Sequence, residues 1–203
     1  MNINYWEILQ KNRGTLSVFS LKWDFLGWLA DSAGHEQVIV VADTCAILSH
    51  VQELIDRETS RFSTFGAELS IFSSVGRPPE EVVIFLPFRV RLELEKLAKS
   101  RRSALAARAL ELNGPGIVWQ SAMDYARDLA FMDELVTHVR RSTNMIVAVA
   151  SGDDHILRNT LLLRAYAEEY AKSVVFYTND REFQGKMRRN GVPTYVSPQL
   201  ELR

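Results

Sequence analysis

The chain has 203 residues, of which 47% are hydrophobic and 24% charged, so it can bury a core and is not disordered by composition. This length fits one domain, or one domain with an appendage. The 24 basic and 25 acidic residues give a net charge of -1. The overall charge therefore gives no reason to expect nucleic-acid binding, although local clusters of basic residues can still bind it. A single cysteine excludes a disulfide framework, and no apolar run is long enough to span a bilayer. We therefore expect an intracellular protein of the nucleus or cytoplasm, with no membrane partner.

The first 37 residues stand apart from the remainder and are predicted to form a helical extension, with two helices divided near residues 12–14. This extension is rich in aromatic residues, namely Trp6, Phe19, Trp23, Phe25 and Trp28. The rings can pack on the domain that follows. Alternatively, if they are exposed together, they can provide a docking surface for a protein partner.

From residue 38 onward, short apolar runs alternate with helical patterns. The runs predict strands at 38–42, 82–86, 145–150, 174–177 and 194–196. Apolar residues at helical spacing predict helices over 47–55, 90–112, 121–140 and 152–171, with a short one around 183–187. The segment 57–80, rich in Ser and Gly, is predicted to be a surface loop. This alternation favours one α/β domain over residues 38–203, with a largely parallel sheet.

Acidic residues follow the predicted strands. Asp43 comes directly after the first strand, Asp153 and Asp154 follow the third, and Asp180 follows the fourth. In a parallel sheet the carboxyl ends of the strands share one edge, and ligands bind there. Each aspartate can also be explained as a helix N-cap, because each precedes a helical pattern.

Glu93, in the helix after the second strand, borders an apolar stripe, since it lies three residues after Val90 and four before Leu97. A glutamate in that position needs a cation or a hydrogen-bond partner, unless it is solvated at the rim. Carboxylates gathered together raise one another's pKa, and a hard divalent cation such as Mg²⁺ or Mn²⁺ relieves this repulsion. In such a site one ion activates a water and a second, about 4 Å away, stabilises the leaving oxygen, so the pattern predicts a two-metal-type site for phosphodiester hydrolysis.

Four motifs, taken in order, resemble those of the PIN-domain nucleases. They are Val40-Val41-Ala42-Asp43-Thr44, the stretch from Leu86 to Leu97, the stretch from Ser151 to Leu157, and the stretch from Tyr177 to Phe183. The resemblance spans about residues 38–197 and is strongest to the eukaryotic PIN endonucleases of nonsense-mediated decay and nuclear transcript surveillance. It implies a PIN-like α/β fold with a central parallel sheet of about five strands and helices on both faces. It also implies a Mg²⁺- or Mn²⁺-dependent endonuclease that cleaves single-stranded RNA.

The same resemblance implies roles for particular residues. The metal ligands, direct or through water, would be Asp43, Glu93, Asp153 and Asp180. Thr44 and Thr178 would orient carboxylates or water. Asp154 competes with Asp153, which we prefer because Ile156 follows it at the interval typical of the family.

The sequence departs from the family pattern at two positions. Cys45 stands where Asn is frequent, and Asn179 replaces the first acid of a common Asp-Asp pair. We expect Cys45 to be a small core residue. Because some family members are inactive scaffolds, the alternative function is a PIN-fold scaffold that binds protein or RNA in an RNA-processing or RNA-surveillance complex.

Basic residues flank the predicted site. Those expected on the helix after the second strand are Lys96, Lys99, Arg101, Arg102 and Arg108, and those after the fourth motif are Lys186, Arg188 and Arg189. They are candidates for contacts with RNA phosphates. Charged helix faces are also commonly solvated without a binding role, so both interpretations stay open for these basic residues. A histidine at a helix start, such as His155, is likewise commonly just solvated.

Overall fold

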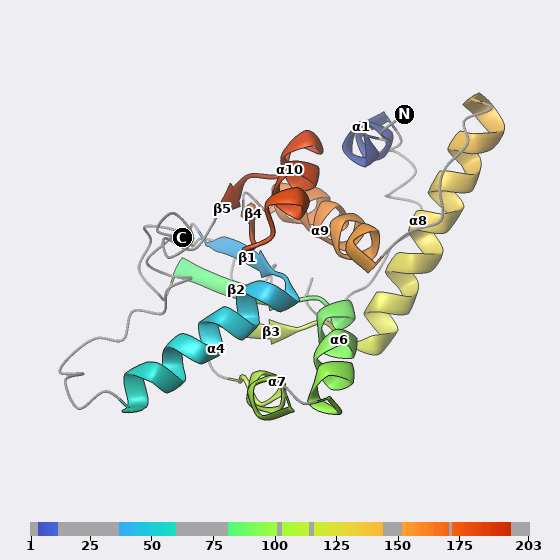
Figure 1. Ribbon diagram of the computed structural model, residues 1–203. Helices are drawn as coiled ribbons and strands as arrows, with labels where there is room; N and C mark the ends of the chain where they lie inside the picture. The colour runs from blue at the N-terminus through green and yellow to red at the C-terminus, as the bar shows by residue number, and fades with distance from the viewer. Residues whose placement is uncertain are drawn as a thin grey trace.

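A computed structural model describes residues 4–11, 37–59, 81–100, 103–113, 116–143, 152–170 and 172–195. Within these ranges a five-stranded parallel sheet lies between helices, with the strand order β3-β2-β1-β4-β5 (Figure 1). The predicted α/β fold with a central parallel sheet is therefore confirmed.

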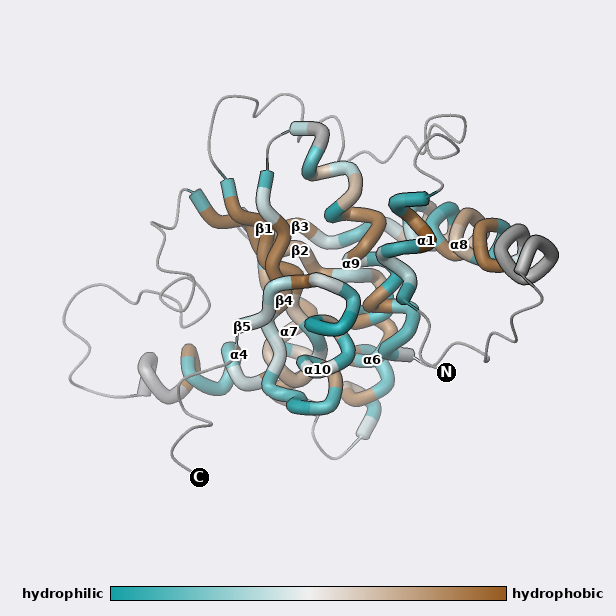
Figure 2. Tube along the Cα trace, turned by 90° about the horizontal axis from the view of Figure 1, so that it is seen from above, coloured by the Kyte–Doolittle hydropathy of each residue, from teal (hydrophilic) through white to brown (hydrophobic). Residues whose placement is uncertain are grey.

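The central strands are buried on both faces. The strands are β1 (Val38–Ala42), β2 (Val82–Leu86), β3 (Ile117–Trp119), β4 (Ser173–Tyr177) and β5 (Thr194–Tyr195). Every residue of β1 and β2 is buried, which explains why both read as continuous apolar runs rather than as alternating ones. Figure 2 shows the apolar residues concentrated on the strands, with hydrophilic residues on the surrounding helices.

The edge strand β3 was not predicted from the sequence. It has three half-buried residues and pairs with β2 from Ile84↔Ile117 to Leu86↔Trp119. Gly116, whose φ is 83°, directs the chain into β3, and its carbonyl accepts a hydrogen bond of 2.7 Å from Ile84 N. Three apolar residues are too few to show a period, which explains the omission. The predicted strand at 145–150 lies outside the described residues.

Helices cover both faces of the sheet. Figure 1 shows α4 (Thr44–Thr59) and α7 (Ser103–Leu110) on one side and α9 (Gly152–Glu169) and α10 (Arg181–Arg189) on the other. Helix α6 (Phe88–Ala98) packs against α7, α4 and α9, while α8 (Ala122–Thr143) projects from the body. No helix of the described chain is both long and apolar enough to cross a bilayer.

The prediction of one helix over 90–112 is wrong, because α6 ends at Ala98 and α7 begins at Ser103. Ser100 accounts for the break locally. Its backbone N–H and its hydroxyl both donate to the Leu97 carbonyl, at 2.9 and 2.6 Å, so the side chain competes with the next helical turn.

The first helix, α1 (Tyr5–Lys11), packs on α9 and on the end of α10. The Tyr5 N–H donates to Asn190 Oδ1 at 3.0 Å, and Leu9 is 1% exposed. The Arg164 guanidinium lies 4.1 Å from the centre of the Trp6 ring. Residues 4–11 therefore follow the packing interpretation. The other aromatic residues of the extension lie outside the described residues, and a domain boundary at residue 37 stays a prediction.

We expect Leu9→Ala to lower the free energy of unfolding by about 2–4 kcal/mol, because it removes a fully buried side chain and leaves a cavity. Urea denaturation measures the change. Gln10→Ala, exposed on the same helix, is the matched control and should change stability by less than about 0.5 kcal/mol. A small effect for Leu9→Ala would mean that α1 does not belong to the cooperative unit.

Candidate active site

The order of the strands creates a switch point between β1 and β4. From β1 the chain passes to β2 and β3 on one side, and later to β4 and β5 on the other. Open parallel sheets bind ligands beyond the carboxyl ends of the strands at such a point. The pair Ala42↔Tyr177 closes the β1–β4 register, so Asp43 and Thr178 come next, side by side.

Asp43 is buried at this switch point, with 5% of its surface exposed. Its Oδ1 accepts a hydrogen bond of 2.7 Å from Ala46 N, so Asp43 caps α4 as the cap interpretation requires. Its Oδ2 accepts a hydrogen bond from the Thr178 hydroxyl. Two elements that are distant in sequence thus hold one carboxylate in a single orientation.

Burial raises the pKa of Asp43 to about 6. The hydrogen bonds from Thr178 and Ala46 oppose this rise, and the negative charges of Asp180 and Asp153 add to it. An ionised Asp43 is therefore costly for the protein unless a cation lies nearby.

Glu93 joins the N-terminal turns of three helices. Its Oε2 accepts a hydrogen bond of 2.5 Å from the Thr44 hydroxyl at the start of α4. Its Oε1 accepts from Arg89 Nε at 3.1 Å, an i, i+4 ion pair on α6. Gly152, at the start of α9, lies so close that a Cβ there would be 3.2 Å from Glu93 Oε1 and 3.0 Å from an Arg89 nitrogen. Glu93 thus has both kinds of partner that we expected as alternatives, a cation in Arg89 and a hydrogen-bond donor in Thr44, and both belong to the chain itself.

The adjacent acids of α9 have different surroundings. Asp154 forms an ion pair with Lys186 of α10, with 2.6 Å between Oδ1 and Nζ. Asp153 is exposed, yet partial desolvation raises its pKa. Lys186 opposes that rise, while Asp180, Glu93 and Asp154 contribute to it. Asp153 is therefore affected by the charges of the other acids but forms no direct ion pair with Lys186, whereas Asp154 does form that pair.

Asp180 is the N-cap of α10. Its Oδ1 accepts hydrogen bonds from Glu182 N at 2.8 Å and from Phe183 N at 3.1 Å. The Thr178 hydroxyl, which donates to Asp43, also accepts from the Asp180 N–H at 3.0 Å. The cap interpretation is therefore confirmed here too, and it leaves Asp180 in the same electrostatic neighbourhood as Asp43.

The pKa of the Cys45 thiol indicates that the four acids lie around one position. Its side chain is exposed, whereas we expected a core residue, because Ala46 and Ile47 are the positions of this turn that face the core. Partial desolvation raises the pKa of the Cys45 thiol, and four acids raise it further: Asp43, Asp180, Glu93 and Asp153. The carboxylates that the sequence places on four separate segments thus share one electrostatic field.

This group of carboxylates fits a divalent cation in chemistry and in charge. All the donors are carboxylate oxygens, which Mg²⁺ and Mn²⁺ prefer, and the raised pKa of Asp43, caused first by burial and then by the charges of Asp180 and Asp153, is one that a cation would lower. In the described part of the chain, however, no three acidic, histidine or cysteine side chains already stand close enough to share one ion. Sharing one ion would therefore require side chains to move. Asp153 is exposed, whereas Asp180, although exposed, is held by its cap bonds to Glu182 N and Phe183 N.

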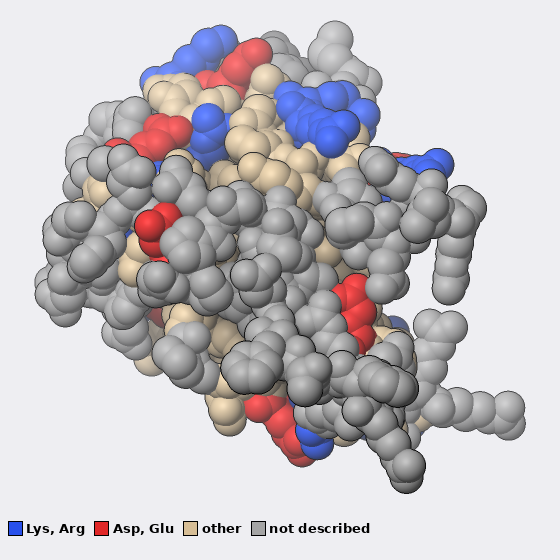
Figure 3. Space-filling view, turned by 90° about the vertical axis from the view of Figure 1, so that its left-hand side faces the viewer, with Lys and Arg blue, Asp and Glu red and all other residues tan. Residues whose placement is uncertain are grey.

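The candidate RNA-binding residues are only partly accounted for. Lys186 reaches the acids, whereas Arg188 Nε donates to Thr194 Oγ1 at 2.7 Å on the outer edge of α10. Lys96 and Lys99 are exposed at the end of α6, and Arg101 and Arg102 lie outside the described residues. Figure 3 shows basic and acidic side chains interspersed on one face of the molecule. The contacts of these residues with RNA stay predictions.

Sequence reasoning did not assign a role to Arg89 or to Tyr125. Arg89 had a signal, namely the i, i+4 spacing to Glu93. Tyr125 had none, because α8 carries it to the site from a distant part of the chain. Burial raises the pKa of its hydroxyl, while the charge of Arg89 and a hydrogen bond from it act in the opposite direction.

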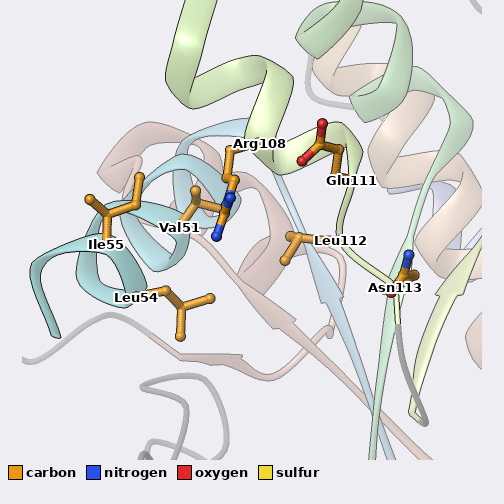
Figure 4. A pocket seen from close by; sticks show the side chains of 7 residues that line it. All are labelled: Val51, Leu54, Ile55, Arg108, Glu111, Leu112 and Asn113. Atoms are coloured by element: carbon orange, nitrogen blue, oxygen red, sulfur yellow. The ribbon is translucent and has the colours of Figure 1, made fainter. Parts of the chain in front are cut away.

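A hollow of about 230 Å³ lies apart from the acids, between α4 and α7 (Figure 4). Its lining residues are Val51, Leu54, Ile55, Arg108, Glu111, Leu112 and Asn113. None of the predicted metal ligands lines it.

The parallel sheet, with acids at its switch point, defines an α/β protein with a candidate ligand site at the carboxyl edge of its strands. A family model described as the PIN domain matches residues 40–196, and the chain therefore belongs to the PIN-domain family. PIN domains are generally nucleases that use divalent metal ions.

Comparison with solved structures finds a similar chain in the crystal structure of VapBC2 from Rickettsia felis bound to a DNA fragment from their promoter. The identity is 14% and the TM-score 0.41, and the match covers 78% of this chain and 98% of the other. None of the curated proteins compared with the chain matches it significantly.

The pKa of Asp43 predicts how stability depends on pH without metal. Because the folded-state pKa of about 6 exceeds the ordinary aspartate pKa of 3.8, folding favours protonated Asp43. This contribution is complete below about pH 4 and is lost as the pH rises through about 6. We expect Asp43→Asn, which is neutral and keeps an acceptor for Ala46 N, to be more stable than wild type by about 1–3 kcal/mol at about pH 8. The difference should shrink toward zero at about pH 4.

Urea denaturation in a chelator, across this pH range, measures the effect. Glu95→Gln, a half-exposed acid of α6, is the control and should show little change in pH dependence. A variant at position 43 that is less stable than wild type at every pH would mean that the α4 cap stabilises the Asp43 anion more than burial destabilises it.

Proposed function

We propose that this PIN domain is a Mg²⁺- or Mn²⁺-dependent endoribonuclease that cleaves single-stranded RNA and leaves 5′-phosphate and 3′-hydroxyl ends. The observation that carries the proposal is the buried Asp43 at the switch point, whose pKa rises under the combined effect of burial and two neighbouring acids. Such a carboxylate disfavours its own ionisation, and a bound cation would remove this cost. The resemblance of the four motifs to eukaryotic surveillance endonucleases supports a transcript as the substrate, in the nucleus or the cytoplasm.

The protein's own residues would fix the reacting groups. Thr178 and Ala46 hold both oxygens of Asp43, and Thr44 orients Glu93. With Asp153 and Asp180, these carboxylates would hold the divalent ion. When bound, Mg²⁺ or Mn²⁺ lowers the pKa of a water to give the nucleophile and offsets charge on the phosphate. Lys186, which forms an ion pair with Asp154, would contact a phosphate oxygen if it left that carboxylate.

The test is cleavage of an unstructured RNA in Mn²⁺, compared between the wild type and single variants. Asp43→Asn and Asp153→Asn should each lower the cleavage rate by about 100-fold or more. Mutation of residues that only hydrogen-bond to metal ligands already lowers activity by about 10–100-fold, and the loss of a ligand should cost at least as much. Glu95→Gln, outside the site, should cut like the wild type. Variants as active as the wild type would overturn the assignment of these acids.

Metal binding gives a second, independent readout. Mn²⁺ should raise the melting temperature of the wild type, because an ion that binds only the folded state stabilises it. The rise should be much smaller for Asp43→Asn, which lacks one of the predicted metal ligands. Equal shifts in both proteins would place the ion elsewhere.

The alternative, a scaffold that binds without cutting, has one observation in its favour. Glu93 and Asp154 already form ion pairs with Arg89 and Lys186, so the chain neutralises part of its own acidic field. A wild-type protein that shows neither cleavage nor a thermal shift with Mg²⁺ or Mn²⁺, while still binding RNA or a protein partner through residues 1–37, would support the scaffold and reject the nuclease.

A further inference from the structure

Three aromatic rings from three helices meet beside the acids. They belong to Phe88 at the start of α6, Tyr125 in the first turn of α8 and His155 in the first turn of α9, and we call them the aromatic surface. The ring centres of Phe88 and Tyr125 are 5.5 Å apart, and those of Tyr125 and His155 are 6.4 Å apart. All three residues are half-buried, so each keeps part of its surface exposed to solvent.

The fold does not use these rings as core. Neither Phe88 nor Tyr125 belongs to the hydrophobic core, or to the partly buried residues packed against it, as far as the described residues show. The rings contact one another instead. Half-exposed aromatic residues that do not serve the core are typical of binding surfaces.

The position of the aromatic surface is fixed by buried polar contacts. The Phe88 N–H donates to Gln120 Oε1 at 3.1 Å, and Gln120, itself buried, donates to Asp128 Oδ2 at 2.6 Å. Asn159 of α9 donates to the same Asp128 oxygen. The start of α6 is therefore joined to the second turns of α8 and α9 through one network, and rings on such a support need little reordering to bind a ligand.

The aromatic surface adjoins the candidate active site directly. Phe88 precedes Arg89, the partner of Glu93, and His155 follows Asp153 by two residues. Tyr125 lies close enough for the charges of Arg89 and Glu93 to affect its hydroxyl. A ligand whose phosphate lies at the acids would therefore place its adjoining group at these rings.

We propose that the aromatic surface stacks an unpaired base of single-stranded RNA, next to the phosphate held at the acids. The proposal rests on the proposed function, because it takes its substrate class from it. Aromatic side chains bind bases of any sequence by stacking, and they reach them only where the strand is unpaired. Arg89 adds a planar cation at the edge of the surface.

Three basic side chains near the site are already engaged by carboxylates. Arg89 forms an ion pair with Glu93, Arg91 with Glu95 and Lys186 with Asp154. Each would have to leave its carboxylate before it could pair with an RNA phosphate. The rings, by contrast, can stack on a base without breaking an ion pair.

The experiment measures the affinity of the full chain for a short, labelled, unstructured RNA by fluorescence anisotropy. Ca²⁺ replaces Mn²⁺, and a gel confirms that the RNA stays intact. Tyr125→Ala should weaken binding about tenfold, and Tyr125→Phe, which keeps the ring, should stay within about twofold of the wild type. Met123→Ala, 64% exposed on the same helix, is the matched control and should bind like the wild type.

An abasic scan of the RNA identifies the stacked base. At one position, removal of the base should weaken wild-type binding about as much as Tyr125→Ala does, and the variant should be insensitive to that removal. Equal losses for intact and abasic RNA, or no loss with Tyr125→Ala, would overturn the proposal. Circular dichroism of each variant separates these outcomes from misfolding.

The two proposals can fail separately. Ring-dependent RNA binding without cleavage would reject the nuclease and keep the stacking surface. Cleavage of RNA with an unchanged kcat/KM in Tyr125→Ala would keep the nuclease and reject the stacking surface. If no RNA is bound at all, the stacking proposal is wrong.

Discussion

The burial of one carboxylate organises this protein. Asp43 ends the central strand β1, caps α4 and accepts the hydroxyl of Thr178 at the end of β4. These contacts connect the two strands on either side of the switch point, and they fix an acid in a place where its charge is costly. The sheet could be stable without an acid there, so we interpret the cost as one that the site, and not the fold, requires.

The surrounding charges limit this cost without removing it. The helices α4, α9 and α10 begin at these acids, and the partial positive charge at a helix N-terminus favours a nearby carboxylate. Arg89 and Lys186 add full charges at the rim. Buried Asp43, at the centre, receives hydrogen bonds but no ion pair within the described structure, and burial raises its pKa to about 6. A small multivalent ion is the partner that the proposed function requires at this centre.

The sequence allowed the main strands to be predicted because their burial leaves a pattern. The runs at 38–42 and 82–86 are covered on both faces and are apolar at every position. The positions of Asp43 and Asp180 followed from the ends of β1 and β4. The resemblance to PIN domains added the order of the motifs, while the roles of the acids as metal ligands stay predictions.

Other features depend on contacts that a single sequence does not display. The break after Ala98 rests on one serine side chain, and β3 is too short to show a period. The exposure of Cys45 depends on which face of α4 meets the sheet. Tyr125 reaches the site because a buried network of amide groups and one carboxylate joins α6, α8 and α9, and no local pattern encodes such a network.

Helix α1 extends the folded unit beyond the region that defines the family. The PIN-domain match begins at residue 40, yet Tyr5 contacts Arg158 of α9, and Trp6 lies under Arg164 of the same helix. A polypeptide trimmed to the matched region would keep every catalytic candidate but would uncover the surface on which Leu9 is seated. Inactivity of such a fragment would then reflect a loosened scaffold and would say nothing about its chemistry.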